Sequence, residues 1–106
     1  MNVNITFKGM EPSEAIKQYA IDRTSKLSKF VTPTTTLNVT LFKEKVRELA
    51  ELTFNFRGQT YTAKTFSEDI YSSIDKMCDK VVAQLRRGKE KRVNHKAPGM
   101  EDTPEE

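Results

Sequence analysis

Four segments of the chain alternate apolar and polar residues, which is the pattern of a strand with one buried face. The first segment precedes Gly9, the next two flank the charged stretch 43–48, and the fourth follows the stretch 57–59. Gly58 in that stretch tolerates a positive φ, so the last two strands are predicted to form a hairpin. The alternating apolar and small residues are Val3, Ile5 and Phe7; Leu37, Val39 and Leu41; Leu52, Phe54 and Phe56; and Tyr61, Ala63 and Thr65.

A first helix is predicted from Pro12 and Ser13 to just before Pro33. Pro suits a first helical turn, and Ser can cap a free backbone amide there. Apolar residues then recur at the three-, four- and seven-residue spacings that define one helical face. These residues are Ile16, Tyr19, Ala20, Leu27 and Phe30.

A second helix is predicted after Ser67, Glu68 and Asp69. A capping hydroxyl and two carboxylates there meet the exposed amides and the positive end of the helix dipole. The helix is expected to fray or end near Gly88. Its apolar face is formed by Ile70, Ile74, Met77, Cys78, Val81 and Leu85.

The order of elements predicts an α+β fold, β-α-β-β-β-α, with a four-stranded mixed sheet and two helices packed on one face. The first two strands, joined across a helix, should be parallel, and the others antiparallel. A chain of 106 residues has room for one domain. We expect that domain to span residues 1–96 and a flexible acidic tail to span 97–106, because Ala97, Pro98 and Gly99 break regular structure.

The formal net charge of +3 conceals a more basic domain, because four carboxylates follow Met100 and the preceding residues carry +7. Such a surplus favours a polyanionic partner, although many basic domains are simply soluble. No signal-peptide pattern and no apolar stretch long enough for a membrane span occurs in the sequence. We therefore expect a soluble, cytoplasmic protein without a membrane partner.

Residues suited to catalysis are scarce. His95 is the single histidine and Cys78 the single cysteine, and Cys78 falls on an apolar helical face where a thiol has a raised pKa. No catalytic triad, metal cluster or glycine-rich phosphate loop can be assembled. The sequence therefore predicts no enzymatic activity, no cofactor or metal, and no small-molecule substrate.

Charges on the second predicted helix are segregated by sign. On a helical wheel Lys76, Lys80, Arg87 and Lys91 share one stripe, and Asp75 and Asp79 lie on the opposite flank of the polar half. On the first helix Lys26 and Lys29 lie off the apolar face, and Arg23 lies within it, where its long stem can carry the charge outward.

If the helices pack side by side, these cations are predicted to form one continuous basic surface for the phosphate backbone of a nucleic acid. A solvated helical face with no ligand is the alternative interpretation. Tyr71 could stack on a base, but packing against the sheet is the expected role, and Phe54 and Phe56 are expected in the core. The candidate phosphate-binding residues are Arg23, Lys26, Lys29, Lys76, Lys80, Arg86, Arg87, Lys89, Lys91 and Arg92.

Residues 67–85 read SEDIYSSIDKMCDKVVAQL. This segment resembles the signature helix of the ribosome hibernation promoting factor and ribosome-associated inhibitor A family, in its short form. Asn4-Ile5-Thr6 and Lys26-Leu27 also resemble the family pattern, so the likeness covers about residues 2–92. Ile70, Ser73 and Thr24 depart from it, and these changes affect packing detail.

The resemblance implies a fold related to double-stranded RNA-binding domains. It also implies binding to the small ribosomal subunit and its 16S rRNA, in the channel that messenger and transfer RNA use, and inhibition of translation in stress or stationary phase. Single or paired ribosomes would be the larger partners. The matching basic positions are Lys26, Lys76, Lys80, Arg87 and Lys89. An alternative function is a protein-binding regulator of the sigma-factor modulator type, with an interface less sensitive to salt.

Overall fold

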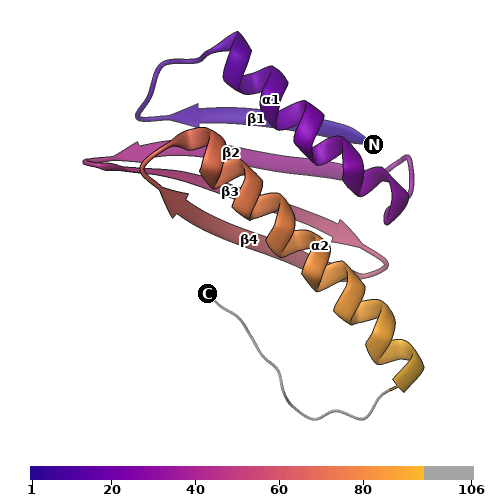
Figure 1. The fold of residues 1–106 in the computed structure, drawn as a ribbon. Helices are drawn as coiled ribbons and strands as arrows, with labels where there is room; N and C mark the ends of the chain where they lie inside the picture. Colours follow the sequence, from indigo (N-terminus) through magenta and orange to yellow (C-terminus); the bar gives the residue numbers. More distant parts are fainter. Residues whose placement is uncertain (95–106) are drawn as a thin grey trace.

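The computed structural model describes residues 1–94, with side chains as far as Arg87. Its elements follow the predicted order (Figure 1). The elements are β1 (Asn2–Lys8), α1 (Glu14–Thr24), the 3-10 helix η1 (Ser25–Lys29), β2 (Thr36–Glu44), β3 (Arg47–Phe56), β4 (Gln59–Ser67) and α2 (Ile70–Asn94). The β-α-β-β-β-α prediction is confirmed. The predicted tail, 97–106, lies outside the described residues.

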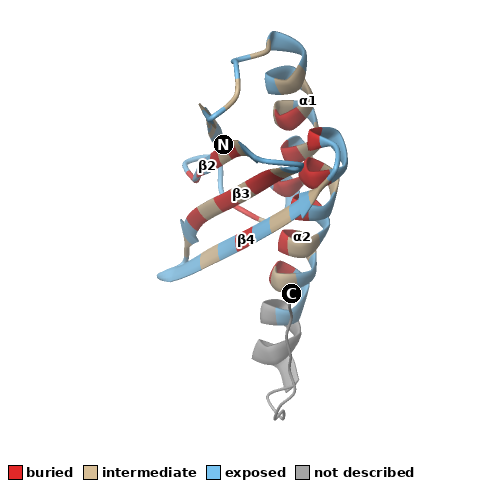
Figure 2. Ribbon diagram, turned by 90° about the vertical axis from the view of Figure 1, so that its left-hand side faces the viewer, coloured by how far each residue is buried: buried red, intermediate tan, exposed pale blue. Residues whose placement is uncertain are grey.

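The four strands form one sheet in the order β1-β2-β3-β4. As predicted, β1 and β2 are parallel and the other neighbours are antiparallel. Both helices cover the same face, with α1 against β1 and α2 against β3 and β4 (Figures 1 and 2). In the register, Val39 faces Leu52, which in turn faces Ala63, so the inward positions of neighbouring strands meet beneath the helices.

The core lies between the sheet and the helices, where buried positions gather in Figure 2. Phe54, Leu27, Leu37, Leu41, Leu52, Ile74 and Met77 are its largest fully buried side chains. Most predicted apolar positions are confirmed here. Among the described residues, no helix is long and apolar enough to cross a membrane.

The β2–β3 connection is tighter than the sequence predicted. The charged stretch 43–48 was expected to separate two strands, but only Lys45 and Val46 lie outside β2 and β3. Lys43 faces Glu48 across the hairpin, and their side chains form an ion pair at 3.8 Å. Opposite charges at facing positions support strand pairing, so charged residues can extend a hairpin here.

The β3–β4 turn confirms the predicted hairpin. Arg57 and Gly58 both adopt positive φ, at 55° and 75°. Positive φ at both central residues is the requirement of a type I′ turn, whose twist matches that of the flanking strands. Gly58 tolerates this conformation without strain, whereas Arg57 adopts it despite its Cβ.

The first helix is shorter than predicted, because regular α structure ends at Thr24 and tightens into η1. Ser13 is the expected cap, and its Oγ accepts a hydrogen bond from the Ile16 amide at 3.2 Å. At the other end, Thr24 Oγ1 donates to the Ala20 carbonyl at 2.8 Å, and Ser25 Oγ donates to that of Asp22 at 2.6 Å. Side-chain hydroxyls that donate to carbonyls of the preceding turn compete with the backbone hydrogen bonds of an α-helix. This competition favours the change from α-helix to 3-10 helix after Thr24.

The start of α2 differs from the prediction, because the cap is Asp69 rather than Ser67. Asp69 Oδ1 accepts a hydrogen bond from the Tyr71 amide at 3.3 Å. Glu48 of β3 accepts one from the Ile70 amide at 2.8 Å, so a carboxylate from the sheet satisfies the first turn. Ser67 Oγ accepts from the Asp69 amide at 3.1 Å and thus shapes the approach to the helix. The helix then continues past Gly88 to Asn94.

The open face of the sheet is polar except for one apolar cluster. Leu49 is buried there between Phe42 on β2 and Phe66 on β4, which face it in the register. Cations cover both rings, with Arg47 4.5 Å from the Phe66 ring centre and Lys64 5.3 Å from that of Phe42. These contacts cover part of the apolar cluster, although Phe66 remains 52% exposed.

Candidate nucleic-acid interface

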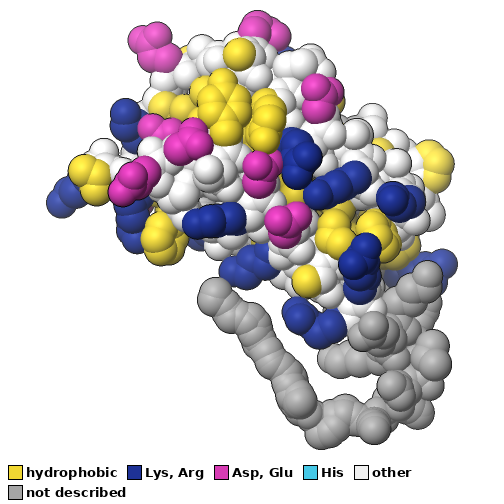
Figure 3. All heavy atoms as spheres, viewed as in Figure 1, with side chains coloured by type: hydrophobic (Ala, Val, Ile, Leu, Met, Phe, Trp, Pro, Cys, Tyr) yellow, Lys and Arg dark blue, Asp and Glu magenta, His cyan; other side chains and the backbone are white. Residues whose placement is uncertain are grey.

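The two helices lie side by side and form the face on which the predicted cations gather (Figures 1 and 3). Acidic side chains are interspersed with the cations on this face (Figure 3). The side chains of Lys89, Lys91 and Arg92 lie outside the described part, although their backbone belongs to α2. The remaining predicted residues are Arg23, Lys26, Lys29, Lys76, Lys80, Arg86 and Arg87.

Ion pairs join α1 and η1 to the acidic flank of α2. Arg23 Nε lies 2.9 Å from Asp75 Oδ1, and Lys26 Nζ lies 3.5 Å from Asp79 Oδ1. The Arg23 Nε is buried and close to its partner, but it is not aligned for a hydrogen bond. Because the Arg23 and Asp75 side chains are about 40% exposed, solvent screens their attraction.

Tyr19 adds a polar contact across the same seam. Its hydroxyl donates to Asp75, with oxygen distances of 2.8 and 3.0 Å. This hydrogen bond raises the pKa of Tyr19 above its ordinary value of 10.0, and desolvation and the negative charge of Asp75 act in the same direction. Asp75 therefore accepts a hydrogen bond from Tyr19 and forms an ion pair with Arg23, both of which lie on α1.

These contacts correct two expectations. Arg23 does not project freely into solvent, because its partly exposed side chain turns toward Asp75. The basic surface is also not continuous, because Asp75 and Asp79 lie within it and pair with Arg23 and Lys26. The helical wheel of α2 placed these carboxylates on a flank of their own, but that flank faces α1 in the folded chain.

A first group of cations surrounds a groove between η1 and α2. Lys29 and Arg86 line it without a carboxylate partner among residues 1–87, and Lys26 lies beside them, paired with Asp79. Phe30 and Val82 supply apolar lining to a hollow of about 360 Å³.

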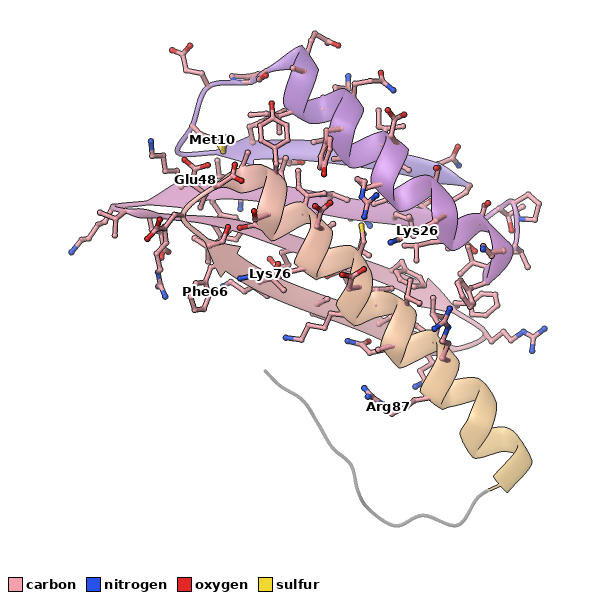
Figure 4. The ribbon with its side chains drawn as sticks, viewed as in Figure 1. Met10, Lys26, Glu48, Phe66, Lys76 and Arg87 are labelled. Carbon is pink, nitrogen blue, oxygen red and sulfur yellow. The ribbon has the colours of Figure 1, made fainter. Side chains whose placement is uncertain are left out.

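A second group, Lys76, Lys80 and Arg87, lies on α2 away from η1. Figure 4 shows Lys76 on the side of β4, near Phe66, and Arg87 farther along α2. Lys76 Nζ donates to the Phe66 carbonyl of β4 at 3.4 Å. Within the described side chains, none of these three cations forms an ion pair with a carboxylate.

The predictions for the aromatic residues and for Cys78 are confirmed in part. Tyr71 does not pack against the sheet, because its ring meets Tyr19 edge-on with centroids 4.9 Å apart. Phe54 is buried as predicted, and Phe56 is half-buried beside the core. Cys78 is fully buried, and burial raises the pKa of its thiol to about 11. Among side chains 1–87, no cluster of His, Cys, Asp and Glu could hold a metal ion.

The sequence reasoning missed Glu48 as a cap for α2 and Phe30 as a wall of the groove. Neither residue carries a local signal for that role, because each acts on an element distant in sequence. The helix pairing did leave a signal. Arg23 and Lys26 are three residues apart, Asp75 and Asp79 are four apart, and either spacing keeps side chains on one helical face.

Cations gathered over two adjacent helices of an α+β domain are the electrostatic feature by which nucleic-acid-binding proteins are recognised. The family described as Sigma 54 modulation protein / S30EA ribosomal protein matches residues 3–93, and the chain belongs to this family. This confirms the predicted family.

Curated relatives agree with that assignment. The chain is 30% identical to a ribosome hibernation promoting factor of Salmonella typhimurium over 95 residues, 90% of this chain and all of the relative. It is also 30% identical to one of Azotobacter vinelandii, over 88% of this chain and 87% of the relative.

Two solved structures share the fold. The N-terminal domain of Thermus thermophilus Protein Y superposes with a TM-score of 0.76 at 21% identity, over 83% of this chain and 99% of that one. A ribosomal subunit interface protein of Coxiella burnetii gives 0.74 at 19% identity, over 84% and 98%.

Proposed function

We propose that this chain is a ribosome hibernation factor that binds the small ribosomal subunit in the channel for messenger and transfer RNA. Bound there, it inhibits translation in stress or stationary phase. Membership in the family, and relatives that are named ribosome hibernation promoting factors over nearly their whole length, support the hibernation role.

The observation that carries the RNA contact is the set of cations without carboxylate partners on the helical face. Among the predicted binding residues with described side chains, these are Lys29, Lys76, Lys80, Arg86 and Arg87. Their flexible stems can reach phosphates, while the sheet behind them fixes the two helices. The proposed mechanism is exclusion: the domain occupies the space that other RNAs need, and no bond is made or broken.

Charge neutralisation sets a magnitude for this binding. If each of the five cations meets one phosphate of a duplex, log K falls with log salt at a slope of about −4.5. Binding should then weaken about 500-fold between 50 and 200 mM salt. A solvated face with no RNA ligand would show no such dependence.

The test replaces Lys76, Lys80 and Arg87 together with glutamine and measures co-sedimentation with small subunits over a salt series. The slope should become shallower by about 2.7, because three phosphate contacts are lost. A matched variant replaces Lys8, Lys17 and Lys45, which are exposed at β1, the outer side of α1 and the β2–β3 turn. It has the same net charge and should retain nearly the full slope.

Thermal unfolding of both variants checks that each one folds. Equal slopes for the two triple variants would mean that net charge alone drives binding, and the proposed surface would be wrong. Unchanged binding by the first variant would have the same consequence.

A second candidate function is regulation of a protein partner, because the family description also includes sigma 54 modulation. The exposed ring of Phe66, beside Phe42 and Leu49, gives such a partner an apolar contact. Salt-insensitive capture of polymerase subunits after nuclease treatment, lost on Phe66→Ser, would favour this function.

A further inference from the structure

The groove between η1 and α2 is built from two elements distant in sequence. Lys26 and Lys29 come from η1 and Phe30 from its end, whereas Asp79, Val82, Ala83 and Arg86 come from α2. Figure 4 shows Lys26 near the start of η1 facing α2, on the side opposite Lys76. The two cation groups therefore lie on different sides of α2.

The charges of the groove favour an anion. Asp79 is its one carboxylate among the lining residues, and Lys26 pairs with it at 3.5 Å. Lys29 and Arg86 then remain with no carboxylate partner in the described part of the chain. An arginine fork opposite a lysine ammonium is a good donor set for phosphate oxygens.

The apolar lining of the groove favours a ligand with an apolar or aromatic part in addition to an anion. Phe30 and Val82 are only half-buried, so part of each side chain borders the hollow instead of the core. An inorganic ion gains nothing from an aromatic ring, whereas a nucleobase gains stacking and dispersion there. The combination of an aromatic wall and cations is typical of sites for single-stranded nucleic acid.

The size of the groove limits the ligand. A hollow of about 360 Å³ is near the lower end of the range for ligand pockets, which is about 300–1,000 Å³. It suits a single nucleotide rather than a longer stretch. Bases inside a duplex are stacked on their neighbours, so only an unstacked base can reach the ring.

We propose that this groove binds one unstacked nucleotide, with its phosphate between Lys29 and Arg86 and its base against Phe30 and Val82. The inference rests on the proposed function, since it makes the groove a specific contact within the wider RNA surface. An extruded nucleotide of folded RNA and a free nucleoside monophosphate share this chemistry, and the experiment distinguishes them.

The test titrates the full chain, without ribosomes, and follows the Phe30 ring by NMR and affinity by calorimetry. The ligands are inorganic phosphate, adenosine monophosphate, a single-stranded RNA tetranucleotide and a short blunt RNA duplex. The two ligands with an unstacked base should perturb the Phe30 ring, and phosphate and duplex should not. Phe30→Leu should weaken tetranucleotide binding about tenfold and leave duplex binding unchanged.

The control is Phe56→Leu. Phe56 is also half-buried and lies under a cation, with Arg57 5.3 Å from its ring centre, but it is outside the groove. This variant should bind the tetranucleotide as the unchanged chain does. Asp79→Asn should instead strengthen binding severalfold, because it removes the negative charge and releases Lys26. Misfolding would weaken binding, so a gain in affinity for Asp79→Asn cannot be explained by a misfolded variant.

Tighter binding of the tetranucleotide than of the monophosphate identifies RNA as the source, and the reverse order identifies a free nucleotide. The proposal is overturned if phosphate binds as tightly as the monophosphate, or if Phe30→Leu weakens duplex and single strand equally. No ribosome is present in this assay. Its failure is therefore separate from failure of the proposed function, which the Lys76, Lys80 and Arg87 variant tests.

Discussion

Replacing Glu48 with alanine should destabilise the domain by about 2 kcal/mol, because this side chain caps α2 from the neighbouring sheet. Glu48 Oε1 accepts a hydrogen bond from the Ile70 amide at 2.8 Å. Ile70 is buried, with an exposed fraction of 3%, so water cannot readily replace the lost acceptor. The carboxylate also lies at the positive end of the helix dipole.

The magnitude combines these effects. Loss of a capping acceptor costs about 1 kcal/mol, and loss of the charge at the helix end adds about 0.3–1 kcal/mol. The ion pair with Lys43, at 3.8 Å and partly exposed, adds little. For a domain of this size, a loss of about 2 kcal/mol lowers the melting temperature by roughly 10 °C. Glu48→Gln keeps an acceptor and should lose only about 0.5 kcal/mol.

The assay is urea unfolding followed by helical circular dichroism, with the midpoint lowered and the slope unchanged. Glu44→Ala is the matched control, because Glu44 is exposed and pairs with Arg47 at 3.6 Å on the same hairpin. Its effect should stay within about 0.5 kcal/mol. Equal losses for Glu44→Ala and Glu48→Ala, or no loss for the latter, would refute the assigned capping role.

Three further outcomes follow from the helix seam and the core. Asp75→Asn should release Arg23 from its ion pair and steepen the salt dependence of RNA binding by about 0.9 in slope, measured by filter binding; an unchanged slope would show that Arg23 does not reach RNA. Tyr19 should ionise at higher pH than a free tyrosine, because its pKa is raised. Since the folded pKa exceeds the unfolded value of 10.0, the stability that Tyr19 contributes is present below pH 10.0 and lost as pH rises through the folded pKa. Alkaline unfolding should detect this loss, and Tyr19→Phe should abolish it. Cys78, with its thiol pKa near 11, should be alkylated slowly in the folded chain and rapidly in urea; rapid labelling of the folded chain would contradict its burial.

The fold was largely predictable because its strands have one buried face each. Val39 and Leu41 alternate with polar residues, and the period of two directly reports the inward side. The shortened α1 was not predictable from apolar spacing, because Leu27 remains buried in a 3-10 helix. The extension of β2 and β3 into the charged stretch was missed for a related reason, since Lys43 and Glu48 pair with each other there and are not part of a buried face.

The candidate site was predictable in its residues but not in its arrangement. The wheel of α2 separates Lys76 from Asp75, and that separation is present in the fold. The helical wheel cannot show which neighbouring element packs against each side of α2. Asp75 meets Arg23 only because α1 packs beside α2, a contact between residues far apart in sequence. The groove at Phe30 depends on the same packing and was missed for the same reason.

The edge strand β4 has a protective feature in its contacts with α2. Gln84 donates to the Thr62 carbonyl at 2.8 Å, and Lys76 donates to that of Phe66 at 3.4 Å. Carbonyls already occupied in this way are poor acceptors for an incoming strand from another molecule. The outer edge of β4 therefore offers fewer free carbonyls for pairing with a strand of another molecule. If Lys76 binds an RNA phosphate as proposed, the Phe66 carbonyl loses its donor, and this part of the β4 edge becomes free to accept a hydrogen bond.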